Sequence, residues 1–186
     1  RVRDAYIAAM STIAQSIIET PEDGRTDLVG MSRAELATLF EQLGLPQFRV
    51  KQVWHWIYHH GVRDFTEMTT ISKDMQRKMA DMFVISRPTI ATEQTSTDRT
   101  RKWLMKFGDG KMAEAVHIPD NDRGAVCMSA QVGCTLTCKF CHTGTQRMVR
   151  NLTPAEIVGQ FMLARDSYGE WPSSKEPRQL TNIVMM

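Results

Sequence analysis

The chain has 186 residues, of which 42% are hydrophobic and 24% are charged, and its formal net charge is +2. This composition is ordinary for a globular protein that is long enough to bury a substantial core in one or two domains. No uninterrupted apolar run approaches the ~18 residues of a membrane span, and the N-terminus lacks the apolar core of a signal peptide. Because the net charge is small, any nucleic-acid-binding surface must come from local clustering of charge.

The two ends of the chain predict that it is part of a longer polypeptide. It begins with Arg1 rather than Met, and it ends in the apolar run NIVMM, which is typical of the interior of a strand. Apolar residues recur at helical spacing over residues 4–18, and a polar stretch follows over residues 20–27. We therefore expect an N-terminal helix and linker over residues 1–29.

Residues 30–87 have the pattern of a small helical domain. Ser32 and Glu35 have the spacing of a capping box, which predicts a helix that ends at Gly44. A second helix is expected after Pro46, and a third begins near Ser72. The apolar stripes of the three helices predict the core of this domain, which is expected to contain Leu36, Leu39, Phe40, Leu43, Val50, Val53, Trp54, Ile57, Tyr58, Met75, Met79, Met82 and Phe83.

The second of these helices also presents a polar face. Lys51, His55 and His59 recur at four-residue steps, and Arg49 lies just before them. Cations suit phosphates and aromatic rings suit bases, so this face is a candidate RNA contact, chiefly through Arg49, Lys51 and His55. An ordinary solvated helix face is the alternative. Histidines at this spacing are not a convincing metal site on sequence alone without an acidic partner or a cysteine beside them.

The periodicity changes from helical to alternating after Pro88, which predicts a β-hairpin extension over residues 88–121. Its strands are expected over 89–97, 102–107 and 111–118. The turn Gly108-Asp109-Gly110 connects the last two strands. On the returning strand, Glu114 shares a face with two apolar residues, which is unusual for a carboxylate. A surface glutamate on an edge strand is the plainer interpretation.

Residues 122–186 have the pattern strand, helix, strand. Cys127 lies on the first strand, expected over 125–131, and a capping threonine and a proline at 153–154 begin the helix. The last strand is expected over 180–186. This order predicts the start of a parallel barrel, in which loops at the carboxyl ends of the strands form the active site. The expected fold class is therefore α/β, with a helical domain and a hairpin that lead into a partial, TIM-like (β/α) barrel.

Three of the four cysteines lie in the loop after that first strand, in the sequence VGCTLTCKFCHTGT. Cys134, Cys138 and Cys141 have the spacing C-x-x-x-C-x-x-C, which allows three thiolates to bind one iron–sulfur cluster or metal ion. A cubane cluster with three cysteine ligands keeps one iron free to bind a substrate, much as catalytic zinc keeps an open position. The main alternative is a zinc site with Cys127 or His142 as fourth ligand, although zinc sites usually present two separated ligand pairs.

The stretch CMSAQVGCTLTCKFCHTGTQRMVRNLTPAEIVGQ, residues 127–160, resembles a known family. Its cysteine spacing, with Phe140 just before the last cysteine, resembles the signature of the radical S-adenosylmethionine (SAM) enzymes. Cys127, seven residues before the first of these cysteines, and RNLTPAEIV after them resemble the RNA adenine methyltransferases of the RlmN family. The Cfr-type resistance methyltransferases are close cousins. A looser similarity extends from about Met31 to the last residue.

The resemblance implies a set of cofactors and a role for several residues. The three loop cysteines are expected to bind a [4Fe-4S] cluster whose open iron binds SAM, and Phe140 is expected to help to exclude water. Members of the family methylate a cysteine near their C-terminus and form a transient protein–RNA adduct through it. Glu114 matches the carboxylate that accepts the adenine proton, and Cys127 matches the thiol that releases the carrier through a disulfide.

The resemblance also implies an activity, a substrate and partners. We expect methylation of carbon 2 of an adenine in 23S rRNA, and also in tRNA, by a cytoplasmic monomer that takes electrons from a donor such as flavodoxin. The helical domain would help to recognise RNA. The alternatives are methylation of carbon 8, as in the Cfr-type enzymes, and a non-catalytic, zinc-stabilised RNA-binding module. The fragment alone is expected to be inactive, because the carrier cysteine and a glycine-rich SAM contact would follow Met186.

Overall fold

The computed structural model describes residues 24–121, 123–136, 138–174 and 176–186. The helix expected over residues 4–18 lies outside these residues. The chain divides into two compact units, Arg1–Ser86 and Arg87–Met186. None of the helices in the described ranges is long and apolar enough to cross a membrane.

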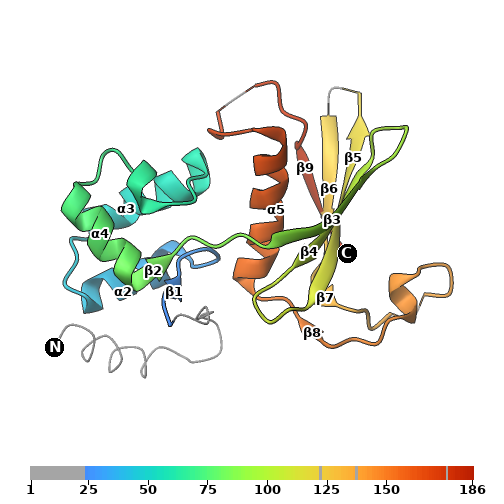
Figure 1. Ribbon diagram of the computed structural model, residues 1–186, viewed down its shortest axis with the longest axis horizontal. Coiled ribbons are helices and arrows are strands. Elements are labelled where there is room, and N and C mark those ends of the chain that lie inside the picture. The colour runs from blue at the N-terminus through green and yellow to red at the C-terminus, as the bar shows by residue number, and fades with distance from the viewer. Residues whose placement is uncertain (1–23, 122, 137, 175) are drawn as a thin grey trace. The chain divides into compact units, whose positions relative to one another are not determined.

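The described part of the first unit consists of helices and one pair of short parallel strands (Figure 1). Its elements are β1 (Thr26–Asp27), α2 (Arg33–Gln42), α3 (Phe48–His55), the π-helix η1 (Trp56–His60), the 3-10 helix η2 (Phe65–Glu67), α4 (Lys73–Met82) and β2 (Phe83–Val84). The predicted capping box of α2 is confirmed, because Ser32 and Glu35 each accept a backbone hydrogen bond from the other. Phe40 and Phe83 are fully buried, and their rings stack with centroids 6.2 Å apart in the core of this unit.

The second predicted helix differs from the expected uniform α-helix at its C-terminal end. After His55 the chain continues as a π-helix, and the backbone N–H of Gly61 donates to the carbonyl of Trp56, five residues earlier. Gly61 adopts a left-handed conformation with φ of 72°, which ends the helix. The wider turn places His59 and His60 close to His55.

The second unit is built on a five-stranded mixed sheet in the order β3-β4-β5-β6-β9. Its strands are β3 (Thr89–Thr95), β4 (Arg101–Lys106), β5 (Met112–Asp120), β6 (Arg123–Met128) and β9 (Asn182–Met185). The first four strands pair antiparallel, and β9 pairs parallel to β6. The strands of the expected hairpin extension therefore continue into β6 within one sheet.

The strand predicted over residues 125–131 ends earlier than expected. β6 stops at Met128, and β7 (Gln131–Val132) pairs instead with β8 (Arg150–Asn151) in a separate two-stranded sheet. The 3-10 helix η3 (Thr143–Thr145) lies between β7 and β8. The break matters because β7 and β8 form the base from which the cysteine-containing loop extends.

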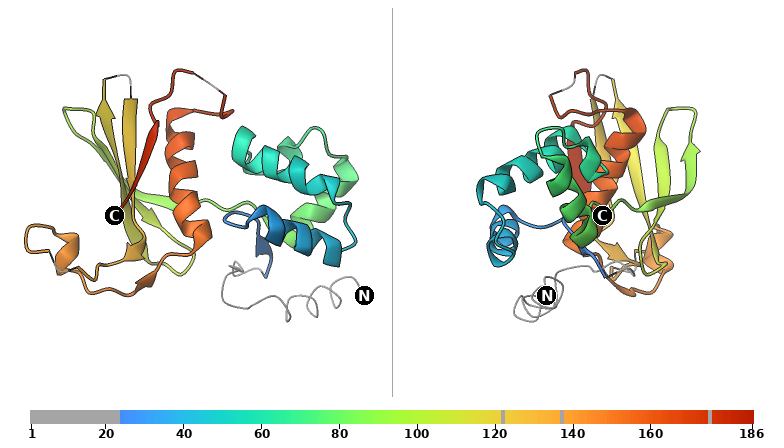
Figure 2. Two further views of the ribbon diagram at one scale, coloured as in Figure 1. Left: turned by 180° about the vertical axis from the view of Figure 1, so that it is seen from behind. Right: turned by 60° about the vertical axis from the view of Figure 1, so that its left-hand side comes forward.

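Helix α5 (Pro154–Tyr168) covers one face of the five-stranded sheet (Figures 1 and 2). Its predicted N-terminus is confirmed, because Thr153 and Glu156 form a capping box with proline at the start of the helix. Trp103, Val126 and Ala164 are fully buried in the core between this sheet face and the helix. The parallel strands β6 and β9 with α5 between them confirm the predicted order strand, helix, strand, whereas the complete barrel stays a prediction.

Candidate functional site

The cysteine loop, residues 133–149, lies beyond the carboxyl end of β6 and is closed at its base by β7 and β8 (Figure 1). Cys134 forms an isolated β-bridge with Arg147, and its backbone N–H donates to the carbonyl of Gln146 at 3.2 Å. The backbone N–H of Leu136 points at the Cys134 Sγ, 3.3 Å away. Cys134, near the start of the loop, is thus held by backbone contacts with residues near the end of the loop. Its sulfur accepts a hydrogen bond of the kind that tunes the reduction potential of a cluster.

The other two cysteines lie on a tight turn. The backbone N–H of Cys141 donates to the carbonyl of Cys138 at 3.2 Å, and that of Gly144 donates to the carbonyl of Cys141 at 3.0 Å. A side chain at Gly144 would place its Cβ 2.6 Å from the Cys138 carbonyl oxygen. Gly133 has φ of +77°, and a Cβ there would lie 2.3 Å from the Arg147 carbonyl oxygen. Both glycines are therefore required by close backbone approach.

The three thiols of the loop are free and half-buried. Among the described residues, three histidines of the first unit are the one set of three potential metal ligands whose donor atoms all lie within 4.8 Å of one another. The loop cysteines are not part of that set. A single zinc ion would hold tetrahedral thiolates about 3.8 Å apart, given Zn–S bonds of about 2.3 Å. In a cubane each thiolate binds a different iron, so the sulfurs stay further apart. Three thiolates on one loop could each bind a different iron of a single cluster.

The Phe140 side chain is exposed to solvent, whereas a side chain that excludes water from a closed site would be buried. Its side chain is 94% exposed, and Leu136 on the same loop is 76% exposed. The loop therefore presents apolar surface beside its cysteines. The expected shielding by Phe140 stays a prediction.

Glu114 and Cys127 lie on adjacent strands and share one face of the sheet. Cys127 of β6 pairs in register with Val116 of β5, and Glu114 lies two residues before Val116. The alternate residues of β5, Ala113 and Ala115, are buried on the opposite face. The structure thus brings the predicted carboxylate and thiol to the face that α5 does not cover.

Two residues that sequence reasoning missed support this region. Lys102 of β4 forms an ion pair with Glu114, with Nζ 3.1 Å from the carboxylate, and both side chains are 43% exposed. Arg150 of β8 binds both carboxylate oxygens of Glu156, at 2.6 and 2.7 Å, and its Nε donates to Asp109 at 2.9 Å. These hydrogen bonds raise the pKa of Arg150. Arg150 therefore joins the end of the cysteine loop to the start of α5 and to the hairpin turn.

The predicted polar face of the first unit is present on α3. The Arg49 guanidinium lies over the Phe48 ring, 4.7 Å from its centroid, and donates to the Gln52 side chain at 2.6 Å. Lys51 and His55 are exposed. Arg49 is therefore partly committed to intramolecular contacts, whereas Lys51 is open to solvent.

Comparisons with known proteins cover both units. Residues 26–85 match a family model described as the ribosomal RNA large subunit methyltransferase N-terminal domain. The crystal structure of a radical SAM methyltransferase from Sphaerobacter thermophilus superimposes with a TM-score of 0.75 and 35% identity, over 86% of this chain and 46% of that one. The dual-specificity RNA methyltransferase RlmN of Gluconobacter oxydans is 67% identical over 168 residues, which are 88% of this chain and 41% of the relative. The corresponding protein of Granulibacter bethesdensis is 58% identical over 187 residues, covering 98% and 47%.

The fold of the described residues is similar to part of a radical SAM methyltransferase, and the three-cysteine loop fits that class. Within that class the chain belongs to the RlmN family, of which it represents the N-terminal portion. This confirms the resemblance seen in the sequence. The chain spans less than half the length of the two curated relatives named here.

Proposed function

We propose that this chain is the N-terminal part of an enzyme that methylates carbon 2 of an adenine in 23S rRNA and also in tRNA. The observation that carries the proposal is the cysteine loop at the carboxyl end of β6, next to a sheet face that presents Glu114 and Cys127. The name shared by the relatives, dual-specificity RNA methyltransferase, supports RNA as the substrate and more than one RNA as target.

The loop cysteines fit the cofactor that this activity needs. Cys134, Cys138 and Cys141 would hold a [4Fe-4S] cluster, and the cluster with SAM supplies one-electron chemistry when bound, with flavodoxin as a suitable donor. The chain itself contributes the amide hydrogen bond to the Cys134 sulfur and the close turn between Cys138 and Cys141. The exposed Phe140 ring supplies apolar surface that would exclude water once the site is covered.

Glu114 and Cys127 would act after the methyl carrier has become attached to the adenine. The Glu114 carboxylate would accept the proton from carbon 2, and Lys102, 3.1 Å away, would position it. The Cys127 thiolate would form a disulfide with the carrier sulfur as the bond between that sulfur and the methyl carbon breaks. Both residues belong to neighbouring strands, so one substrate could meet both of them.

Mass spectrometry of RNA from cells that lack the full gene, and from the same cells with the gene restored, tests the activity. We expect 2-methyladenosine in 23S rRNA and tRNA to disappear and to return. Appearance of 8-methyladenosine instead would assign the carbon 8 reaction. Iron and sulfide analysis after anaerobic reconstitution should give a cluster in the wild type and none in Cys134→Ala; zinc without sulfide would favour the binding-module alternative.

The role of Cys127 has its own test in the full-length enzyme. Cys127→Ala should keep the cluster and still form 5′-deoxyadenosine, but it should accumulate RNA tethered to protein on denaturing gels. Glu114→Gln should keep the cluster and slow methylation by about 10²–10⁴-fold, the usual contribution of a general base. Normal methylated RNA and no protein–RNA band from Cys127→Ala would reduce this cysteine to a packing role.

A further inference from the structure

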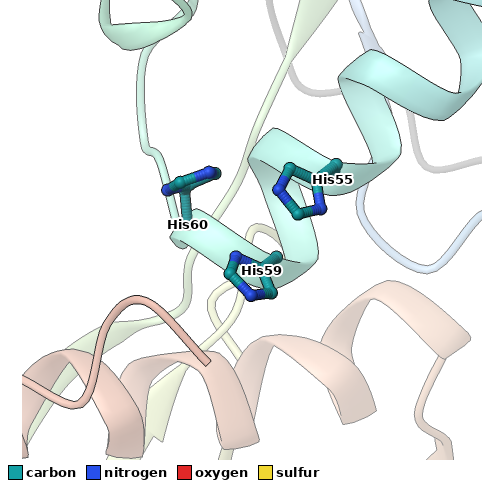
Figure 3. A group of neighbouring side chains, drawn as sticks. All are labelled: His55, His59 and His60. Atoms are coloured by element: carbon teal, nitrogen blue, oxygen red, sulfur yellow. The ribbon is translucent and has the colours of Figure 1, made fainter. Parts of the chain in front are cut away.

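Three histidines come together at the end of the second helix, where the π-helical turn adds His60 to the pair His55 and His59. His55 ends α3, and His59 and His60 belong to the π-helix that follows. Each histidine offers one ring nitrogen as a donor atom, and these three nitrogens lie within 4.8 Å of one another. Figure 3 shows the three side chains gathered at this end of the helix. π-helical turns are rare in proteins, and many of those that are known lie at functional sites.

The packing of the three rings is close. The imidazoles of His55 and His59 stack with centroids 4.3 Å apart and planes 16° apart. The ring of His60 stands edge-on to both, at 4.9 Å from His55 and 5.0 Å from His59. The Nδ1 atom of His59 is buried and has no hydrogen-bond partner. A buried polar atom without a partner is costly, so a ligand that engages this cluster would recover free energy.

A neighbouring side chain holds one of the rings in place. The indole of Trp56 packs on His60 with centroids 4.3 Å apart, and its N–H donates to the Thr70 hydroxyl at 2.8 Å. His55 is exposed and His59 is half-buried, so these two rings can adjust while His60 is supported. Packing against Trp56 therefore limits the rotation of the His60 ring.

We propose that His55, His59 and His60 form a binding site for one divalent transition-metal ion of the borderline class, represented by zinc. Neutral imidazoles suit zinc, nickel and copper, whereas magnesium and calcium require oxygen ligands. Three histidines are a sufficient protein ligand set for zinc and keep further positions for water or an anionic oxygen. Zn–N bonds of about 2.1 Å place tetrahedral nitrogens about 3.4 Å apart, so the donor nitrogens, which now lie within 4.8 Å of one another, would approach and the stacked rings of His55 and His59 would turn to bind one ion.

This site uses none of the loop cysteines and does not depend on the proposed RNA methylation. It also explains the arrangement better than an RNA-stacking face does, because stacked bases need exposed ring faces and here the imidazoles stack on one another. Three imidazoles are sufficient for such a site without the acidic partner or cysteine that the sequence argument required.

Zinc titration of the chain, with its cluster assembled anaerobically so that the loop cysteines are occupied, tests the proposal. Calorimetry should show one zinc ion per chain, and nitrogen-15 spectra should show shifts at three of the five histidine rings. His59→Gln and His60→Gln should each weaken zinc binding at least about 10-fold, since each removes one of three ligands. Lys51→Gln on the same helix is the matched control and should bind zinc normally.

Cobalt as a second probe separates the histidine site from the thiols. Cobalt bound at the histidine site should give visible bands without the near-ultraviolet charge-transfer band of thiolate ligation. The proposal is overturned if zinc shifts no imidazole resonance of the wild-type chain, or if His59→Gln and His60→Gln bind zinc as the wild type does. The wild-type spectra decide the question even if a variant folds poorly.

Discussion

At the scale of single residues, His117 is a titratable side chain that the fold buries. It is 1% exposed, its Nδ1 lies 2.8 Å from the Tyr168 hydroxyl, and its Nε2 lies 3.3 Å from the Gln179 carbonyl. Burial lowers the pKa of His117, although the Gln179 hydrogen bond and the charge of Glu170 oppose the shift. The neutral imidazole is therefore the form that the folded chain accommodates.

This pKa shift predicts loss of stability in acid. The unfolded imidazole binds a proton near pH 6.5, whereas the folded one does so only at lower pH, so the contribution is complete above pH 6.5 and is lost as pH falls through the folded pKa. The melting temperature should decrease between pH 7.5 and pH 5.0 in both proteins, and the decrease should be smaller in His117→Gln than in the wild type. His142→Gln, which removes an exposed histidine, is the control. Equal pH dependence in all three proteins would contradict the prediction.

The sequence predicted the residues that act through local spacing and missed those that act through pairing. The cysteine spacing and the alternation around Glu114 are visible within a few residues. Lys102 reaches Glu114 because β4 and β5 pair in one register, and Arg150 reaches Asp109 across 41 positions. Such partners depend on how strands align, which local patterns do not fix.

At the scale of elements, the cysteine loop depends on a close approach of its own backbone. Because a Cβ at Gly144 would lie 2.6 Å from the carbonyl oxygen and 2.8 Å from the nitrogen of Cys138, Gly144→Ala should displace that cysteine. We expect iron and sulfide per chain to fall by at least half after reconstitution. Gly108→Ala, where a Cβ would meet nothing within 4 Å, is the control. Full iron content in Gly144→Ala would show that the loop can rearrange.

The junction between β8 and α5 depends on Arg150. Glu156 is 5% exposed, so Arg150→Ala would remove the guanidinium that binds its two oxygens and leave a buried carboxylate poorly paired. Arg150 itself is 30% exposed, so solvent moderates the loss to about 1–3 kcal/mol. Hydrogen exchange of the α5 amides measures this loss of stability. Arg77→Ala, which breaks an exposed pair, should change stability by less than about 0.5 kcal/mol.

Element types were predicted more successfully than their ends. The capping boxes at Ser32 and Thr153 lie within four residues of sequence, and both are confirmed. The π-helix was not foreseen, because one additional residue in a turn hardly changes the apolar pattern of so short a segment. The early end of β6 was also missed, since β7 pairs with a strand about 20 residues later along the chain.

At the scale of the whole molecule, the net charge of +2 gives little general attraction to RNA. Binding should therefore depend on local cations, and Arg49→Ala with Lys51→Ala should weaken the affinity for an rRNA fragment. Loss of two phosphate contacts would lower the slope of log affinity against log salt by about 1.5. Lys73→Ala with Arg77→Ala removes the same charge from α4 and is the control. Equal effects of both double variants would indicate non-specific attraction.

The parallel pairing of β9 with β6 has a consequence for the order in which the chain folds. Thr181 contacts Gly124 across 57 positions, whereas β4 and β5 are joined by a short turn. Distant pairings close slowly, so we expect the hairpin to form first and β9 to join last. Pulse-labelled hydrogen exchange should protect the β4 and β5 amides before those of β9. The cysteine loop lies inside this late-closing crossover, so cofactor loading can begin while the polypeptide around it is still open.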